Sequence, residues 1–226
     1  MRSLNRYKLK FSNWPLIAAA VIGLNHLIGL AGLNIPATKE MFEAVSFLNL
    51  LLSAILVLSF HRPLNYRFLF YALTAMSIGF IAEVTGVQTG WPFGSYYYSL
   101  KFGFLVFGVP LIIAVNWLLL SYCCSIVASG FLQNPVLKIV AAALMMVFLD
   151  LFLEPFAIRH SFWTWTNDLP GWQNYMSWFI ISIILQIVYF RIIRTPQRSY
   201  VPLSYLLVLT VFLIGDRLLS LVPELF

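Results

Sequence analysis

Seven apolar runs, each close to the length that crosses a lipid bilayer, dominate this sequence. They cover approximately residues 14–33, 41–60, 66–87, 103–129, 135–155, 175–194 and 200–222. A helix needs about 20 apolar residues to span the hydrocarbon core, where only helices and closed barrels satisfy their own backbone hydrogen bonds. The sequence therefore predicts an all-α fold, a polytopic bundle with seven spans, and we expect a single integral membrane domain over residues 1–226.

The composition supports an integral membrane protein. Hydrophobic residues make up 61% of the chain and charged residues only 10%, and the mean hydropathy is +0.88. Soluble domains carry about 25% charged residues. The net charge of +6 fits a membrane surface and gives no indication of nucleic-acid binding. Cys123 and Cys124 are adjacent in an apolar run, which favours packing over a disulfide or a metal site.

Lys and Arg residues are unevenly distributed between the two sets of connecting segments. With the N-terminus in the cytoplasm, the cytoplasmic set is Arg2, Arg6, Lys8, Lys10, Arg62, Arg67, Lys138, Arg191, Arg194 and Arg198. The opposite set is only Lys39, Lys101 and Arg159. Cytoplasmic loops carry an excess of these residues, so we expect a multi-pass protein of the cell membrane with its N-terminus inside and its C-terminus outside.

Two acids in the fifth span, Asp150 and Glu154, are the most unusual residues of the chain. They lie four residues apart and therefore share one face of a helix. An acid within a membrane span costs about 2.5–3.5 kcal/mol on the insertion scale. The presence of two acids in one span therefore requires a functional or structural explanation. Burial and mutual repulsion both disfavour two negative charges, and we expect at least one group to hold a proton at neutral pH and to be able to act as a general acid. Pro155 should end or bend this helix.

Ion pairing inside the bundle is the structural alternative for the two acids. In this alternative, Arg159, His160 or Arg217 from neighbouring segments neutralises them. Asp216 and Arg217 are adjacent in the last span and point in different directions on a helix, so each needs its own partner.

A third acid, Glu83, lies near the end of the third span and precedes the segment GVQTGWPFGSYYY. Glycines let a backbone turn tightly or approach a ligand closely, and aromatic rings offer flat apolar faces. The aromatic residues are therefore candidates for binding an apolar substrate, with an interfacial aromatic belt as the alternative. These candidates are Trp91, Phe93, Tyr96 and Tyr98.

Further candidates lie in the fourth span and after the fifth. Asn116 and Trp117 follow Pro110, and an asparagine inside a span usually bonds to another helix. Aromatic faces near the acids would stabilise a developing cation, or else anchor the protein at the interface. The candidates after the fifth span are Trp163, Trp165, Asn174 and Trp178.

Several familiar kinds of site are missing from the sequence. It contains no His-x-x-x-His, HExxH or cysteine cluster for a metal, no phosphate-binding loop, no GxSxG elbow and no DxxD diphosphate motif. A retinal-binding pump would need a lysine in the last span, and residues 200–222 contain none. We therefore expect acid–base chemistry with no cofactor and no metal.

The order of these residues resembles the membrane carotenoid biosynthesis protein family, whose characterised members are CruF-type carotenoid hydratases. The resemblance covers residues 83–178. It rests on Glu83 with Gly86, Thr89-Gly90, Phe93-Gly94 with Tyr96 and Tyr98, Pro110 with Asn116-Trp117, Asp150 with Glu154-Pro155, Phe162-Trp163 with Trp165, and Asn174-Tyr175 with Trp178.

This resemblance implies hydration of the terminal C=C of an acyclic (ψ) carotenoid end group, as in lycopene or γ-carotene, to a tertiary alcohol. An acid would protonate the alkene, aromatic faces would stabilise the tertiary carbocation, and water would trap it. Asp150 or Glu154 is then the proton donor, while Glu83 positions water or acts in the reverse role. The expected partners are the carotenoid and membrane lipid, with other carotenoid pathway enzymes as further candidates.

Two alternatives remain open at this point. An end-group cyclase starts from the same protonation, but an internal double bond traps the cation, so a dry pocket gives cyclisation and a wet one gives hydration. The other alternative is a non-catalytic carotenoid- or lipid-binding membrane protein or a transporter. Transporters usually contain inverted repeats, and the sequence shows no repeat.

Overall fold

The computed structural model describes residues 13–195, 197 and 199–221, and seven helices within this part are long and apolar enough to cross a membrane. They are α1 (Trp14–Asn34), α2 (Lys39–Leu58), α3 (Tyr66–Thr89), α4 (Leu111–Phe131), α5 (Pro135–Arg159), α6 (Trp172–Ile192) and α7 (Val201–Leu219). The predicted all-α, polytopic fold is confirmed, and the chain is a multi-pass membrane protein. Its orientation stays a prediction, and five of the basic residues behind that prediction lie outside the described residues: Arg2, Arg6, Lys8, Lys10 and Arg198.

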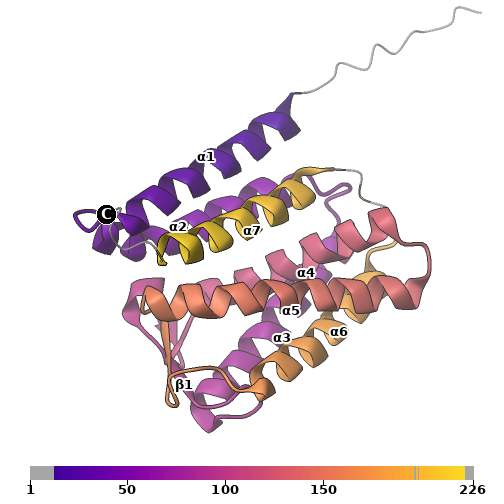
Figure 1. Ribbon diagram of the computed structural model, residues 1–226. Coiled ribbons are helices and arrows are strands. Elements are labelled where there is room, and N and C mark those ends of the chain that lie inside the picture. Colours follow the sequence, from indigo (N-terminus) through magenta and orange to yellow (C-terminus); the bar gives the residue numbers. More distant parts are fainter. Residues whose placement is uncertain (1–12, 196, 198, 222–226) are drawn as a thin grey trace, which may run out of the picture.

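The helices pack in two layers around a central helix (Figure 1). Figure 1 shows α1, α2 and α7 on one side of the bundle and α3, α5 and α6 on the other. Between them lies α4, which contacts α2, α3, α5, α6 and α7. Most side chains of α4 are buried, as expected for a helix that is apolar all round.

Two span boundaries differ from the prediction by four residues or more. The fourth helix begins at Leu111 and not at residue 103, because residues 100–110 form a short 3-10 helix and a hairpin that turns at Phe107 and Gly108, both with positive φ. The fifth helix continues through Pro155 to Arg159, since a proline is tolerated in a transmembrane helix where its surroundings compensate for the lost hydrogen bond. The last helix ends at Leu219, and the predicted end at residue 222 lies outside the described residues.

Short strands, which the sequence did not reveal, join two loops at one end of the bundle. β1 (Tyr96–Tyr98), after α3, pairs antiparallel with β4 (Trp163–Trp165), after α5. β2 (Leu105–Val106) pairs with β3 (Val109–Pro110) in the hairpin before α4. The pairing of β1 with β4 places the two aromatic segments of the sequence side by side.

Candidate active site

Glu83 is buried in α3 and is surrounded by hydrogen-bond donors. Its Oε2 accepts hydrogen bonds from the hydroxyls of Tyr96 (2.5 Å) and Tyr98 (2.9 Å). Its Oε1 accepts one from the indole N–H of Trp117 (3.0 Å). Burial of a carboxylate is costly unless donors replace its water, and here residues from α4 and β1 supply them.

Two glycines on the same face of α3 give these donors access to Glu83. A Cβ atom at Gly79 would overlap the side chain of Trp117. A Cβ atom at Gly86 would lie 2.7 Å from Phe93 Cδ2 and 2.9 Å from the Tyr96 hydroxyl, closer than real Cβ contacts come. The absence of a side chain at both positions is therefore part of the site. Sequence reasoning had noted Gly86 and missed Gly79.

Glu154 is held by a second set of neutral donors. Its Oε2 accepts hydrogen bonds from the indoles of Trp163 (3.0 Å) and Trp165 (2.8 Å), and its Oε1 accepts a longer one from Asn174 Nδ2 (3.3 Å). The same Asn174 nitrogen donates to Asp150 Oδ2 at 2.9 Å. Asp150 Oδ1 is buried and has no hydrogen-bond partner among the described residues. The two acids of α5 thus converge on one amide of α6.

The strand pair β1–β4 brings the two carboxyl groups together. Tyr96 lies opposite Trp165 and Tyr98 opposite Trp163, with ring centroids 4.9 Å and 5.7 Å apart. Alternate residues of a strand point to one face, so these four rings face the bundle. Tyr97, between them, is 59% exposed. The Tyr donors of Glu83 therefore lie against the Trp donors of Glu154.

The hydroxyl groups of Tyr96 and Tyr98 hold their protons strongly. Burial, followed by the negative charge of Glu83, raises the pKa of the Tyr96 and Tyr98 hydroxyls well above the ordinary value for tyrosine. Both hydroxyls therefore stay protonated at neutral pH and act as donors to Glu83.

A small chamber with both polar and apolar walls lies between Glu83 and Glu154. Its volume is about 30 Å³, enough for at least one water molecule. It is lined by Glu83, Phe93, Tyr96, Tyr98, Ile113, Asn116, Leu153, Glu154, Trp163, Trp165, Asn174 and Trp178. Asp150 is not part of this wall and lies behind Asn174.

A larger apolar cavity of about 420 Å³ adjoins the chamber and lies between the two helix layers. Its wall combines residues of α1, α2 and α7 with residues of α4 and α5. Val45 and Leu48 of α2 belong to this wall and are also exposed on the surface, so the cavity opens sideways along a membrane-spanning helix. Four residues line both spaces: Ile113, Asn116, Leu153 and Trp163.

Most of the sequence-predicted site residues meet at the chamber. Trp117 lies directly behind it, bonded to Glu83 and stacked on Trp178 with ring centroids 4.1 Å apart. Trp91 is elsewhere: it is 68% exposed and lies in an external groove between α3 and α6. Sequence reasoning missed Ile113, three residues before Asn116, and Leu153, which directly precedes Glu154. It also missed the contribution of α1, α2 and α7, whose apolar residues carry no distinguishing signal.

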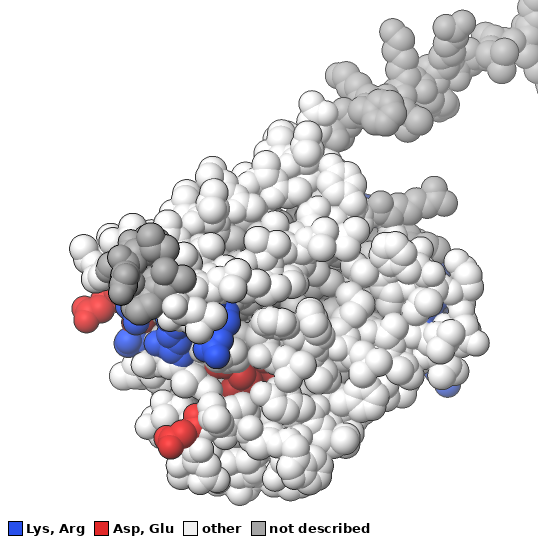
Figure 2. Space-filling view, viewed as in Figure 1, with Lys and Arg blue, Asp and Glu red and all other residues white. Residues whose placement is uncertain are grey.

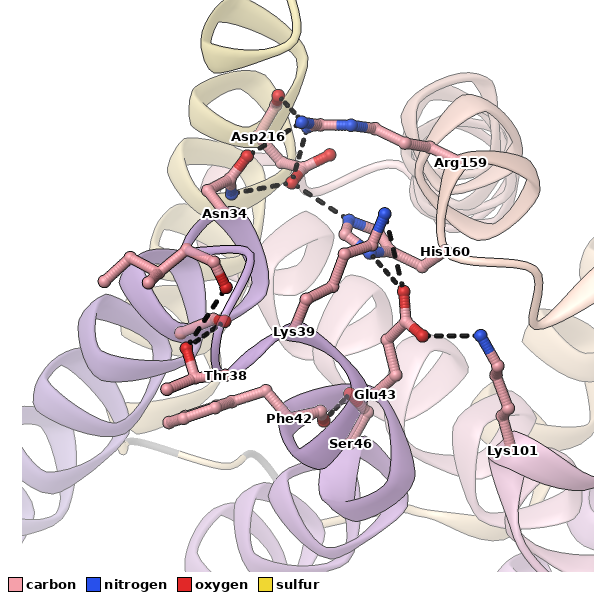
Figure 3. Close-up of polar contacts among 12 residues, drawn as sticks. Asn34, Thr38, Lys39, Phe42, Glu43, Ser46, Lys101, Arg159, His160 and Asp216 are labelled. Carbon is pink, nitrogen blue, oxygen red and sulfur yellow. Dashed lines mark hydrogen bonds and ion pairs between the residues drawn. The ribbon is translucent and has the colours of Figure 1, made fainter. Parts of the chain in front are cut away.

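The basic residues near the acids of α5 bind a different pair of carboxylates (Figure 3). His160 Nδ1 lies 3.2 Å from Glu43 Oε1, and its Nε2 lies 3.1 Å from Asp216 Oδ1. Arg159 pairs with the same Asp216 oxygen at 3.0 Å, and Lys101 pairs with Glu43 at 2.6 Å. The alternative in which Arg159 or His160 neutralises Asp150 and Glu154 is therefore wrong, because both residues pair with other carboxylates.

This second cluster ties the two layers together at the end of the bundle that carries the strands. It joins α2 and α7 to the end of α5 and to the loop before α4. On the surface, Lys and Arg atoms gather beside acidic atoms on a mostly uncharged face (Figure 2). Arg217 is exposed and lies on α7, next to Asp216.

Comparisons with known proteins give one family and one curated relative. A family model described as "Carotenoid biosynthesis protein" matches residues 44–223. The chain is similar to "Bisanhydrobacterioruberin hydratase" of Haloarcula japonica, with 28% identity over 133 residues, which cover 52% of this chain and 42% of the relative. The chain thus matches less than half the length of that relative. No solved structure matches.

Proposed function

The chain belongs to the family of carotenoid biosynthesis proteins, and from this premise we propose that it is a hydratase that adds water to the terminal C=C of an acyclic carotenoid end group. The family implies a carotenoid substrate, and the name of the Haloarcula japonica relative describes a hydratase. One observation carries the proposal: two carboxyl groups line a water-sized chamber, which shares four lining residues with an apolar cavity.

We assign the proton donor to Glu154. Its Oε1 has only the 3.3 Å hydrogen bond to Asn174, which leaves that oxygen free to carry a proton. The donated proton goes to the CH carbon of the terminal double bond, and the carbon that bears two methyl groups becomes a tertiary cation. Trp163 and Trp165 line the chamber, and we expect their indole faces to stabilise this positive charge.

Glu83 has the complementary role. Both of its oxygens accept hydrogen bonds from neutral donors, which favours the ionised form without cancelling its charge. An ionised carboxylate has about four acceptor positions, so one remains for a water molecule. The water oxygen bonds to the cation and its proton passes to Glu83, and return of this proton to Glu154 resets the site. The net change is the addition of one water.

The chamber's size and lining favour hydration over cyclisation. A cavity of about 30 Å³ has room for the water molecule that hydration requires. Its carboxyl, amide and hydroxyl groups also suit a wet site. These features support a hydratase over an end-group cyclase.

Expression of the full chain in a lycopene-accumulating host, followed by mass spectrometry of the pigments, tests the proposal. We expect a carotenoid that has gained the mass of one water. An unchanged mass with a shifted absorption spectrum would indicate a cyclase instead, and unchanged pigments would contradict both activities.

A further inference from the structure

We propose that Asn116 holds the water molecule that traps the carbocation, and thereby decides whether the cation is hydrated or loses its proton again. This inference rests on the proposed hydratase function. It concerns the second half of the reaction, after the acid has acted.

Asn116 lies at the junction of the two cavities. Of the four residues that line both the apolar cavity and the chamber, Ile113 and Leu153 have no polar side-chain atom. The indole N–H of Trp163 is already bonded to Glu154. Asn116 therefore supplies the free polar group at the point where an end group passes from the apolar cavity to the acids.

The hydrogen-bonding groups of Asn116 are unoccupied. Within the part of the chain that the structure describes, its side-chain amide makes no hydrogen bond. The carboxyl and hydroxyl groups around it all do, and so does Asn174. A polar amide in an apolar helix bundle normally has a partner, and a group left open toward a cavity points to water or a ligand.

The chemistry of water attack selects Asn116 over the other open group of the chamber. The indole N–H of Trp178 also has no hydrogen bond among the described residues, but an indole only donates. A donor would occupy the lone pair that must reach the cation. Asn116 Oδ1 accepts a hydrogen bond, so a water that donates one O–H to Asn116 and the other to Glu83 keeps its lone pair free for carbon.

Loss of this amide should therefore separate protonation from hydration. Glu154 and Glu83 remain in place, so the cation still forms. Without a held water it returns a proton to a carboxylate, which regenerates the alkene or gives its double-bond isomer. In heavy water, every such cycle in which the cation loses H and keeps the added deuterium leaves deuterium in the end group of the unhydrated carotenoid.

The test incubates membranes that contain the full chain with lycopene in D₂O and analyses the pigments by mass spectrometry. For Asn116→Leu, which keeps the side-chain size, we expect hydration to fall about tenfold or more, while unhydrated lycopene still gains deuterium. Asn116→Ser, which restores an acceptor and leaves room for water, should recover part of the hydration. Asn116→Val replaces the leucine variant if the latter does not accumulate in the membrane.

Two results would overturn the inference. One is hydration by the leucine or valine variant within about twofold of wild type, a difference too small for a lost reactive-water contact. The other is parallel loss of deuterium uptake and hydration, which would give Asn116 a role before the cation. Failure of the wild-type chain to hydrate lycopene at all would instead reject the proposed function, so the two failures are distinguishable.

Discussion

Carboxyl groups in this bundle are stabilised in two different ways, one at the candidate site and one in the cluster that joins the two layers. Glu43 and Asp216 pair with Lys101, Arg159 and His160, which cancels their charge. Within residues 13–195, 197 and 199–221, Glu83 and Glu154 accept hydrogen bonds only from neutral side chains. Neutral donors hold a carboxylate in place without supplying a positive charge, so the chamber can still stabilise a cation.

Replacement of the chamber acids should stop hydration. Glu154→Gln removes the proton donor and Glu83→Gln the charge that activates water, so we expect product formation to fall by about 10²- to 10⁴-fold in each variant. Pigment analysis in the lycopene-accumulating host measures the loss. Glu40→Gln, at an exposed position of α2, is the matched control and should retain wild-type activity.

Asp150 should matter less, because it contacts Asn174 and not the chamber. We expect Asp150→Asn to retain more activity than Glu154→Gln. Unimpaired product formation in both variants would show that neither acid of α5 is the proton source.

The glycines beside Glu83 should not tolerate even a methyl group. Gly79→Ala forces the Trp117 side chain away from α3, with an expected destabilisation of about 1–3 kcal/mol and loss of hydration. Gly130→Ala, at an exposed helical position with no atom nearby, should be neutral or stabilising, since alanine favours a helix more than glycine does. Thermal unfolding in detergent compares the two, and equal stability of both variants would contradict this account.

At the scale of elements, the apolar runs predicted the seven helices because a bilayer imposes both length and composition. Asp150, Glu154 and Glu83 were also recognisable, since acids in such runs stand out. The strand pair β1–β4 was not, because strands of three residues carry no periodic signal and their partners lie far apart in the sequence. The sequence alone likewise does not distinguish Trp91 from Trp163, because both lie in aromatic loop segments. The pairing of β1 with β4 places Trp163 at the chamber, whereas Trp91 lies outside it.

The connection between α2 and α3 should make stability depend on pH. His61 is buried there, 3.0 Å from the Tyr122 hydroxyl and stacked on Phe68, and burial, aided by the Arg62 charge, lowers the pKa of His61 to about 4. Unfolding restores an ordinary pKa near 6.5, so between these values the unfolded state binds more protons. Stability should therefore be full above pH about 6.5 and fall toward pH 4, by on the order of 1–3 kcal/mol.

Melting temperatures in detergent at pH 7 and at pH 4.5 test this dependence. His61→Gln keeps a polar side chain that does not titrate, so its melting temperature should change less between the two pH values than that of wild type. An identical change in both proteins would assign the pH dependence to other groups.

At the scale of the whole molecule, the site depends on two layers that meet around α4. One layer, with α3, α5 and α6, supplies the acids, and the strands β1 and β4 beside it supply most of their donors. The other, with α1, α2 and α7, closes the apolar cavity. The cluster around His160 joins the layers at the end where the chamber lies, and exposed residues of α2 line one side of the cavity.

The orientation of the bundle can be tested with single cysteines, because Cys123 and Cys124 are both buried and give little background. Asn167→Cys, between β4 and α6, should react with a membrane-impermeant maleimide in intact cells. Gln133→Cys, between α4 and α5, should react only after lysis. The opposite pattern would place the N-terminus outside.

The position of the chamber at one end of the bundle also bears on how a symmetric substrate is processed. Glu83 and Glu154 lie within the last two turns of α3 and α5, near one face of a hydrocarbon layer about 30 Å thick. A rigid polyene with one end at these acids has its other end near the opposite face. Under the proposed hydration, each visit modifies a single end, and the new hydroxyl emerges next to the lipid headgroups on the same face. A molecule that is hydrated at both ends must leave, reverse its direction in the membrane and enter again.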